Sequence, residues 1–351
     1  MALGLTAITA GAEGINFYAL LDGGLAHSKI SGPGTTGNKT EFVTGGYAPN
    51  FFGIKGEKSL GDGYTGGFNL EQGFLLQAPN NSAAWAGYAN NSRFSFGDDS
   101  LFNRQANLYI SGAFGKLTIG TQPNIAFNSV LAVDPRFGSD FGSSLATIVA
   151  DGKLGTIDNG SISYASPTIN GLSGSIQYVP SGPSASSTIS SGARGSLNYS
   201  GDGYTLTLAS YSNHDKTGTS GSHGYVTGGT KKLSDFTLKV LYANQSNNAY
   251  SGLSTTGLGG AYSLAPKTTL DVGYYKSSKG AAYDMKTTGV GVQHKFLKDL
   301  TLYAQYAQVK NSGTDTGVYN FLPPNGSLFN EVITTGQKAT SINVGFLYAF
   351  F

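Results

Sequence analysis

The chain closes on Thr340-Ser341-Ile342-Asn343-Val344-Gly345-Phe346-Leu347-Tyr348-Ala349-Phe350-Phe351, a stretch in which bulky and small residues alternate. Successive side chains of a β-strand point to opposite faces, so every second residue shares a face. One face then carries the bulky residues Ile342, Val344, Phe346, Tyr348 and Phe350. The other face carries the mostly small or polar residues Ser341, Asn343, Gly345, Leu347 and Ala349. The pattern predicts a strand between an apolar and a polar environment, in frame at Phe350 with Phe351 as an extra residue.

The composition of the 351-residue chain narrows the fold class. Charged residues make up 12% of the chain, against about 25% in typical globular domains, so the charged surface of a soluble globule is missing. We find no run of about 20 apolar residues, which a membrane-spanning helix requires. A transmembrane β-barrel requires neither feature, because lipid-facing and lumen-facing side chains alternate along each strand. We therefore expect an all-β transmembrane barrel, with a soluble β-sandwich as the less favoured alternative.

Cysteine usage, charge and the N-terminus bound the function further. The chain has no cysteine, which excludes disulfides, thiolate metal sites and a cysteine nucleophile. The formal net charge of +2 gives no reason to expect a nucleic-acid partner. The ending Ala10-Gly11-Ala12 suits a signal-peptide cleavage site, although no basic segment precedes it. We expect residues 1–12 to be a signal-peptide remnant or an N-terminal extension that plugs or lines the barrel, and residues 13–351 to form one barrel domain.

Period-two alternation between turn-forming clusters predicts sixteen strands along the chain. In the first of them, near 15–25, Ile15 and Phe17 are expected to face outward, and Tyr18 and Asp22 inward. Short connections are expected near 58–63, 115–116, 166–171, 200–203, 231–235, 265–268 and 297–299. Long connections are expected near 27–41, 76–100, 122–155, 181–191, 213–222, 246–254, 279–286 and 311–337. This alternation predicts an antiparallel sixteen-stranded barrel with short periplasmic turns and long extracellular loops.

Several segments follow one another in an order typical of one protein family. They are Ile15–Asp22, Gly53–Glu57, Gly67–Glu71, Phe102–Gly115 and Leu117–Gly120, completed by the closing strand. In this order and spacing the chain resembles the general diffusion porins of β-proteobacteria over roughly Ile15 to Phe350. The closing strand with its last Phe is the assembly signal of such barrels, and the extra Phe351 leaves open which Phe is read.

The resemblance implies a location, partners and a function. It implies a homotrimer in the outer membrane of a Gram-negative cell, in contact with membrane lipid and lipopolysaccharide. Its water-filled channel would pass small hydrophilic solutes and ions by passive diffusion. The third loop, here about Thr121–Gly155, would fold inward and filter solutes by size and charge. Such a loop with carboxylates opposite a basic wall creates a transverse field across the pore.

The candidate residues of this constriction are charged, polar or aromatic. They are Asp22, Phe51, Lys55, Glu71, Gln105, Asp134, Arg136, Asp140, Lys239 and Lys295. Positions where the family usually carries wall arginines or the Gly-Arg of the loop hold Phe51, Gln105, Ile157 and Gly120-Thr121. Arg104 is a further candidate for inward positive charge, with an outward position at the rim as the alternative, because alternation places it on the face of Leu108. The sequence therefore predicts a weaker anion preference than that of its relatives.

Some features of the sequence suggest functions other than a diffusion channel. Phe51, Phe137 and Phe141 near the expected constriction, with the missing arginines, favour a substrate-specific channel as one alternative. The long loops favour a surface receptor or adhesin with a closed lumen as another. His214, Asp215 and His223 suggest a metal site or an acid–base pair, but solvated loop residues are the simpler interpretation. We find no nucleophile with a matching base, and expect no enzyme activity, no metal and no cofactor.

Overall fold

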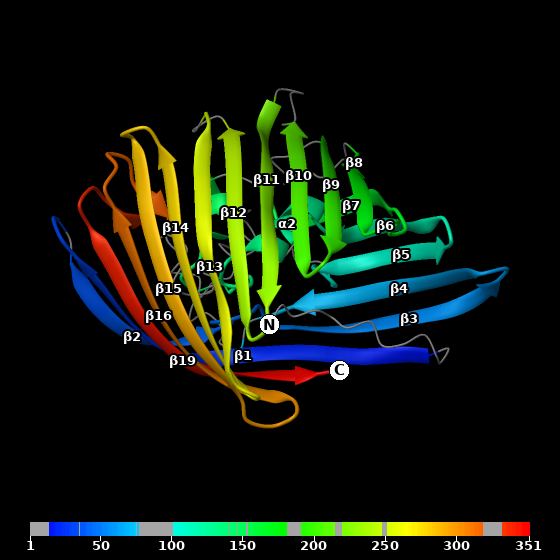
Figure 1. Ribbon diagram of the computed structural model, residues 1–351, viewed down its shortest axis with the longest axis horizontal. Helices are drawn as coiled ribbons and strands as arrows, with labels where there is room; N and C mark the ends of the chain where they lie inside the picture. The colour runs from blue at the N-terminus through cyan, green and yellow to red at the C-terminus, as the bar shows by residue number, and fades with distance from the viewer. Residues whose placement is uncertain are drawn as a thin grey trace.

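The computed structural model describes residues 14–34, 36–74, 76, 101–139, 141–145, 147–151, 154–180, 191–214, 220–247, 251–318 and 332–351. Within these residues, seventeen strand segments form one antiparallel sheet that closes into a barrel (Figure 1). No helix in this part of the chain is long and apolar enough to span a membrane. Residues 1–12, the expected signal remnant or extension, lie outside the described residues.

The segments of the barrel follow the order of the chain. They are β1 (Gly14–Ser31), β2 (Gly37–Thr44), β3 (Phe51–Gly61), β4 (Tyr64–Gly73), β5 (Gln105–Gly112), β6 (Gly115–Pro123), β7 (Ile157–Ala165), β8 (Leu172–Val179), β9 (Ser191–Gly201), β10 (Tyr204–His214), β11 (Ser220–Leu233), β12 (Phe236–Asn247), β13 (Leu253–Ala265), β14 (Thr268–Lys279), β15 (Tyr283–Lys295), β16 (Leu300–Asn311) and β19 (Lys338–Phe350). A separate hairpin pairs β17 (Gly317–Val318) with β18 (Val332–Ile333). The third loop contains α2 (Ile125–Val133) and a short π-helix, η2 (Thr147–Asp151).

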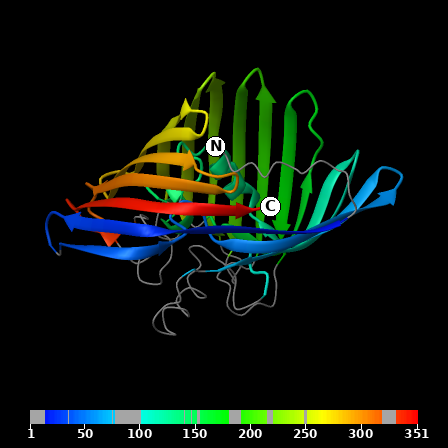
Figure 2. The same ribbon diagram turned by 90° about the horizontal axis from the view of Figure 1, so that it is seen from below.

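The first and last strands close the barrel, as Figure 2 shows for β1 in blue and β19 in red. They pair antiparallel from Ala19 opposite Phe350 to Ser31 opposite Lys338. The other edge of β1 pairs with β3 over its first half and with β2 over its second half. β2 and β3 are therefore two parts of one strand, so the seventeen segments make sixteen strands. The predicted antiparallel sixteen-stranded barrel is confirmed.

The two faces of the sheet divide as the alternation predicts. In β19 the face of Ile342 and Phe346 is exposed on the outside, at 55% and 52%, whereas Asn343 is fully buried inside. In β1, Phe17 is exposed outside and Asp22 is buried inside. An apolar exterior and a polar interior are what a barrel in lipid requires, because water is available only in the lumen.

The short turns lie close to their predicted positions, and two of them share one chemistry. Asp62-Gly63 and Asp202-Gly203 adopt positive φ throughout, 52° and 78° in the first turn and 51° and 72° in the second. Asp-Gly suits such two-residue hairpins because both positions require left-handed backbone. The prediction of a long connection at 27–41 was wrong, because β1 and β2 pair up to Ile30 opposite Gly37. The chain leaves the sheet instead at residues 45–50, between β2 and β3.

Candidate pore constriction

The described residues of the third loop, 124–139, 141–145, 147–151 and 154–156, lie inside the barrel, where α2 is seen within the ring of strands in Figure 1. The Asn124 side chain caps α2 by accepting hydrogen bonds from the N–H groups of Ala126 (2.9 Å) and Phe127 (3.1 Å). The apolar side of the helix, with Val130 and Val133, packs on inward residues of β10, β11 and β12. The loop is therefore bonded and packed to one side of the inner wall.

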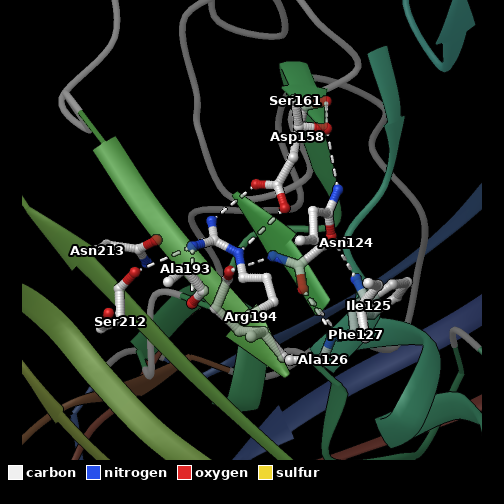
Figure 3. A network of polar contacts seen from close by, with 12 residues as sticks. Asn124, Ile125, Ala126, Phe127, Asp158, Ser161, Ala193, Arg194, Ser212 and Asn213 are labelled. Atoms are coloured by element: carbon white, nitrogen blue, oxygen red, sulfur yellow. Dashed lines mark hydrogen bonds and ion pairs between the residues drawn. The ribbon is translucent and has the colours of Figure 1, made fainter. Parts of the chain in front are cut away.

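The root of the loop is held by a buried ion pair between two strands (Figure 3). Arg194 of β9 donates from Nε and Nη2 to the two carboxylate oxygens of Asp158 in β7, at 3.0 and 2.7 Å. Next to this pair, Asn124 donates to the Leu154 carbonyl at the other end of the loop (3.3 Å). Sequence reasoning missed Arg194 as a site residue. The available signal was its position on the face opposite Leu197, which is exposed outside.

The far end of the loop is held by Arg136, which is fully buried. Its Nε donates to Asp271 of β14 (2.7 Å), and its Nη2 donates to Gln305 of β16 (3.0 Å). Its Nη1 donates to the carbonyl of Phe141, which ties the two sides of the loop tip together. The guanidinium thus fastens the loop to two strands, and we call this arrangement the Arg136 latch.

Glycines on the inner face of β14 and β15 make room for the latch. A Cβ at Gly289 would lie 2.7 Å from the Arg136 Cδ, and one at Gly291 would lie 2.7 Å from its Nη2. Real Cβ atoms essentially never approach another heavy atom so closely. Gly273, which pairs with Gly289, opens the same slot beside the Arg136 Cγ. Part of the high glycine content therefore serves to seat an arginine between loop and wall.

Asp134 and Lys239 also serve to hold the loop. Asp134 accepts hydrogen bonds from the Tyr275 hydroxyl (2.9 Å) and from the N–H groups of Arg136 (3.0 Å) and Gly138 (2.8 Å). Its burial raises the pKa of the carboxyl above the ordinary value, and the hydrogen bond from Gly138 is the largest opposing influence. The Lys239 ammonium donates to the Ala132 carbonyl (2.9 Å) at the end of α2. Asp134, Arg136 and Lys239 thus lie between loop and wall, and the structure brings them together there.

On the wall formed by β1 and β3 to β5, Glu71 is the centre of a polar cluster. It accepts hydrogen bonds from Tyr18 (2.9 Å), Arg104 (2.6 Å) and Gln105 (3.2 Å). The Arg104 guanidinium also lies over the ring of Phe51, 4.8 Å from its centroid. Of the two directions that the sequence left open for Arg104, the structure shows the inward one, because this residue precedes β5 and turns inward to reach Glu71.

Amide side chains and one lysine continue this wall. Asn69 donates to Asn107 (3.0 Å), which donates in turn to the Thr121 carbonyl (2.9 Å). Lys55 is half-buried, with its ammonium 5.4 Å from the centroid of the Tyr18 ring. The wall opposite the loop is therefore rich in amides, with one lysine beside the Glu71–Arg104 pair.

Asp22 lies beneath the segment 45–50, which enters the barrel between β2 and β3. Its carboxylate accepts hydrogen bonds from the N–H groups of Tyr47 (2.6 Å) and Ala48 (2.7 Å) and from the Tyr303 hydroxyl (2.5 Å). Gln305 donates to the Gly46 carbonyl (3.0 Å) and also accepts from Arg136 of the latch. The inserted segment and the loop tip therefore share one partner on β16. Sequence reasoning missed this insertion, for which Gly45-Gly46 followed by Pro49 was the available signal.

The remaining candidates lie apart from this region or outside the described part. Lys295 is exposed at the end of β15, where a short turn leads to β16. Asp140 and Asp215 lie outside the described residues. His214 and His223 lie on the paired strands β10 and β11. Among the residues that the structure describes, no group of three or more His, Asp or Glu side chains is arranged to hold a metal ion.

Comparisons with known proteins give a consistent picture. A family model described as Gram-negative porin matches residues 1–314. An outer membrane porin protein of Bordetella pertussis is 27% identical over 176 residues, which are 47% of this chain and 42% of the relative. The major outer membrane protein P.IA of Neisseria meningitidis serogroup B is 29% identical over 132 residues, 37% of this chain and 28% of the relative. The matches thus span less than half the length of these curated relatives.

Solved structures match over nearly the whole chain. The anion-selective porin from Comamonas acidovorans gives a TM-score of 0.77 at 18% identity, covering 96% of this chain and 99% of that one. OmpT of Vibrio cholerae in its trimer form gives a TM-score of 0.66 at 15% identity, covering 97% and 100%. At these identities the likeness shows the fold alone.

Proposed function

Because the chain belongs to the Gram-negative porin family and its location is the Gram-negative outer membrane, we propose that it forms a water-filled diffusion channel. Small hydrophilic solutes and ions diffuse through this channel passively, without a conformational change of the protein. The narrowest point of the channel lies between the third loop and the wall formed by β1 and β3 to β5. The observation that carries the proposal is the position of the loop, which occupies one side of the lumen. It is bonded to the wall at its root, from the Ile125 N–H to Gln177 of β8, and at its tip, from Arg136 to Asp271 of β14.

The charges near the narrow point support a weak ion preference. Each of the three arginines that the structure describes, Arg104, Arg136 and Arg194, is paired with a carboxylate at 2.6 or 2.7 Å. The positions of α2 that are exposed to the lumen, Asn128 and Ala132, are uncharged. A field across a pore arises from unpaired charges of opposite sign on its two sides. We therefore propose a weaker anion preference than that of porins with an unpaired basic wall.

The test is the reversal potential of the protein in a planar bilayer under a salt gradient. We expect stepwise increases in current as channels insert, and a reversal potential that shows weak ion selectivity. Strong anion selectivity would contradict the proposed charge arrangement. The substitution Glu71→Gln removes the negative partner of Arg104, so the reversal potential should shift toward anions. The matching substitution Asp235→Asn, at an exposed residue of the turn between β11 and β12, serves as the control. It should shift the reversal potential less.

The same recording separates the diffusion channel from the two alternatives. Conductance that saturates, or that one solute blocks, would favour a substrate-specific channel. A correctly folded and inserted protein without conductance would favour a receptor or adhesin.

We propose a homotrimer as the assembled form. OmpT of Vibrio cholerae has a trimer form, and this chain shares its fold. The outer faces of the early strands carry exposed apolar side chains such as Phe17, Leu108 and Ile119, which are able to pack between subunits. We expect unheated electrophoresis in mild detergent to give a band of three subunits that heating converts to the monomer. A monomer band before heating would contradict the trimer.

A further inference from the structure

Four lysines from four consecutive strands of the barrel stand directly opposite one another. Lys276 of β14 pairs with Lys286 of β15, Lys286 pairs with Lys310 of β16, and Lys310 pairs with Lys338 of β19. They are far apart in the sequence, and only the register of the strands brings them together. We call these four residues the lysine row.

The lysine row faces outward. By alternation Lys276 shares the face of Tyr274, and Lys310 that of Tyr306, and both tyrosines are exposed on the outer surface. Lys276, Lys310 and Lys338 are exposed and Lys286 is half-buried. On the next strand Lys29, also exposed, stands opposite Thr340 and so lies one diagonal step from Lys338. Five positive charges therefore line the outer surface from β14 to β1.

Without a partner of opposite charge, such a row of lysines destabilises the sheet. Like charges directly opposite each other on paired strands are destabilising. The structure shows no ion pair between a lysine of the row and any residue that it describes. Among the described residues, Asp284 is the only acidic side chain on the outer face of these five strands, and it lies two residues before Lys286. One carboxylate does not balance five ammonium groups, so the row is suited to an anionic partner from outside the protein.

The row lies at the edge of the apolar exterior. Toward the short turns, the outer face of β19 passes from Lys338 through Thr340 to Ile342, Val344 and Phe346. Lys310 stands opposite Lys338, and Leu300 at the other end of β16 stands opposite Tyr348. Ten residues separate Lys310 from Leu300, roughly 33 Å along a strand at about 3.3 Å per residue. With the usual tilt of about 35–45° this corresponds to the apolar band of about 25 Å in an outer-membrane barrel.

The row is at the extracellular edge of that band. Each lysine lies within three residues of the strand end that leads to the connections 280–282, 312–337 or 32–36. The short turns, which are periplasmic in this family of barrels, lie at the opposite ends of the same strands. The row therefore lies where acyl chains give way to headgroups in the outer leaflet.

We propose that the lysine row binds the phosphate groups of the phosphorylated glycolipid of the outer leaflet, lipopolysaccharide. The four Cα positions span about 14 Å, three steps of about 4.8 Å between neighbouring strands, so more than one phosphate is engaged at once. Lysine suits this boundary because its apolar stem lies along the acyl region while its ammonium reaches the headgroup. The proposal concerns the outer surface and is independent of the ion preference of the pore.

The test compares two fourfold variants that remove the same charge. In one, Lys276, Lys286, Lys310 and Lys338 are each replaced by Gln. In the control, the exposed lysines Lys58, Lys232, Lys267 and Lys298, which lie in or next to the short turns at the periplasmic end, are replaced by Gln. The folded proteins in detergent are titrated with purified lipid A, the phosphorylated anchor of lipopolysaccharide. We expect the first variant to lose affinity by about fivefold for each lysine removed, and the control to bind like the unchanged protein.

Further arms identify the ligand and control for folding. Dephosphorylated lipid A should bind the unchanged protein as weakly as lipid A binds the row variant. Inorganic phosphate at an equal phosphate concentration should not displace lipid A. Single-channel conductance should be the same in the row variant as in the unchanged protein, because the row does not face the lumen. Should the fourfold variant not fold, the single variants K286Q and K310Q should each lose affinity by about fivefold. Equal loss in the control, unchanged binding in the row variant, or displacement by inorganic phosphate would overturn the proposal.

Discussion

Replacement of Arg136 by Ala should lower the free energy of unfolding by about 3–5 kcal/mol, because it leaves the buried carboxylate of Asp271 without its partner. Gln305 and the Phe141 carbonyl lose their donor at the same time. The third loop then loses its ion pair to β14 and keeps the hydrogen bond from Tyr275 to Asp134 on that strand, so the loop tip is held less firmly against the wall. Urea unfolding in detergent measures the first effect, and increased current noise in single-channel recordings measures the second.

A control and a partial rescue make this prediction specific. Lys232→Ala removes an exposed charge near the end of β11, away from the loop, and should leave both the unfolding free energy and the current noise unchanged. The double variant Arg136→Met with Asp271→Leu removes both buried charges, so it should recover part of the lost stability. If Arg136→Ala unfolds like the unchanged protein, the latch does not hold the loop.

Replacement of Asp22 by Ala should have the second large effect. It removes the acceptor of three hydrogen bonds, from the N–H groups of Tyr47 and Ala48 and from the Tyr303 hydroxyl. Each buried donor left without a partner costs about 1–3 kcal/mol, so the three donors together give an expected loss of roughly 3–9 kcal/mol. The segment 45–50 is also released from β1, and the single-channel conductance should change with it.

A graded series distinguishes this anchor from a general loss of charge. Tyr303→Phe removes one of the three donors and leaves the carboxylate in place, so it should cost about 1 kcal/mol. Asp299→Ala, at an exposed position of the turn before β16, should cost nothing measurable. Equal losses in Asp22→Ala and Asp299→Ala would show that the hydrogen bonds to the segment contribute nothing.

The sequence by itself was enough to predict the barrel, its sixteen strands, the sides of the first and last strands that face lipid, and the approximate positions of the short turns. The reason is that these properties are local. An outward residue such as Phe346 and an inward one such as Asn343 differ by their parity along one strand, and a turn such as Asp62-Gly63 needs only its own two residues.

The arrangement of the lumen was decided by tertiary structure alone. Arg136 and Asp271 are 135 positions apart, and the slot that seats the Arg136 side chain depends on three glycines of β14 and β15. No local pattern distinguishes a loop arginine that faces water from one that turns to the wall, because the backbone path of the loop sets the direction. The lysine row is a product of strand register for the same reason. Register is a long-range property of the closed sheet, since each pairing is fixed relative to the next around the whole barrel.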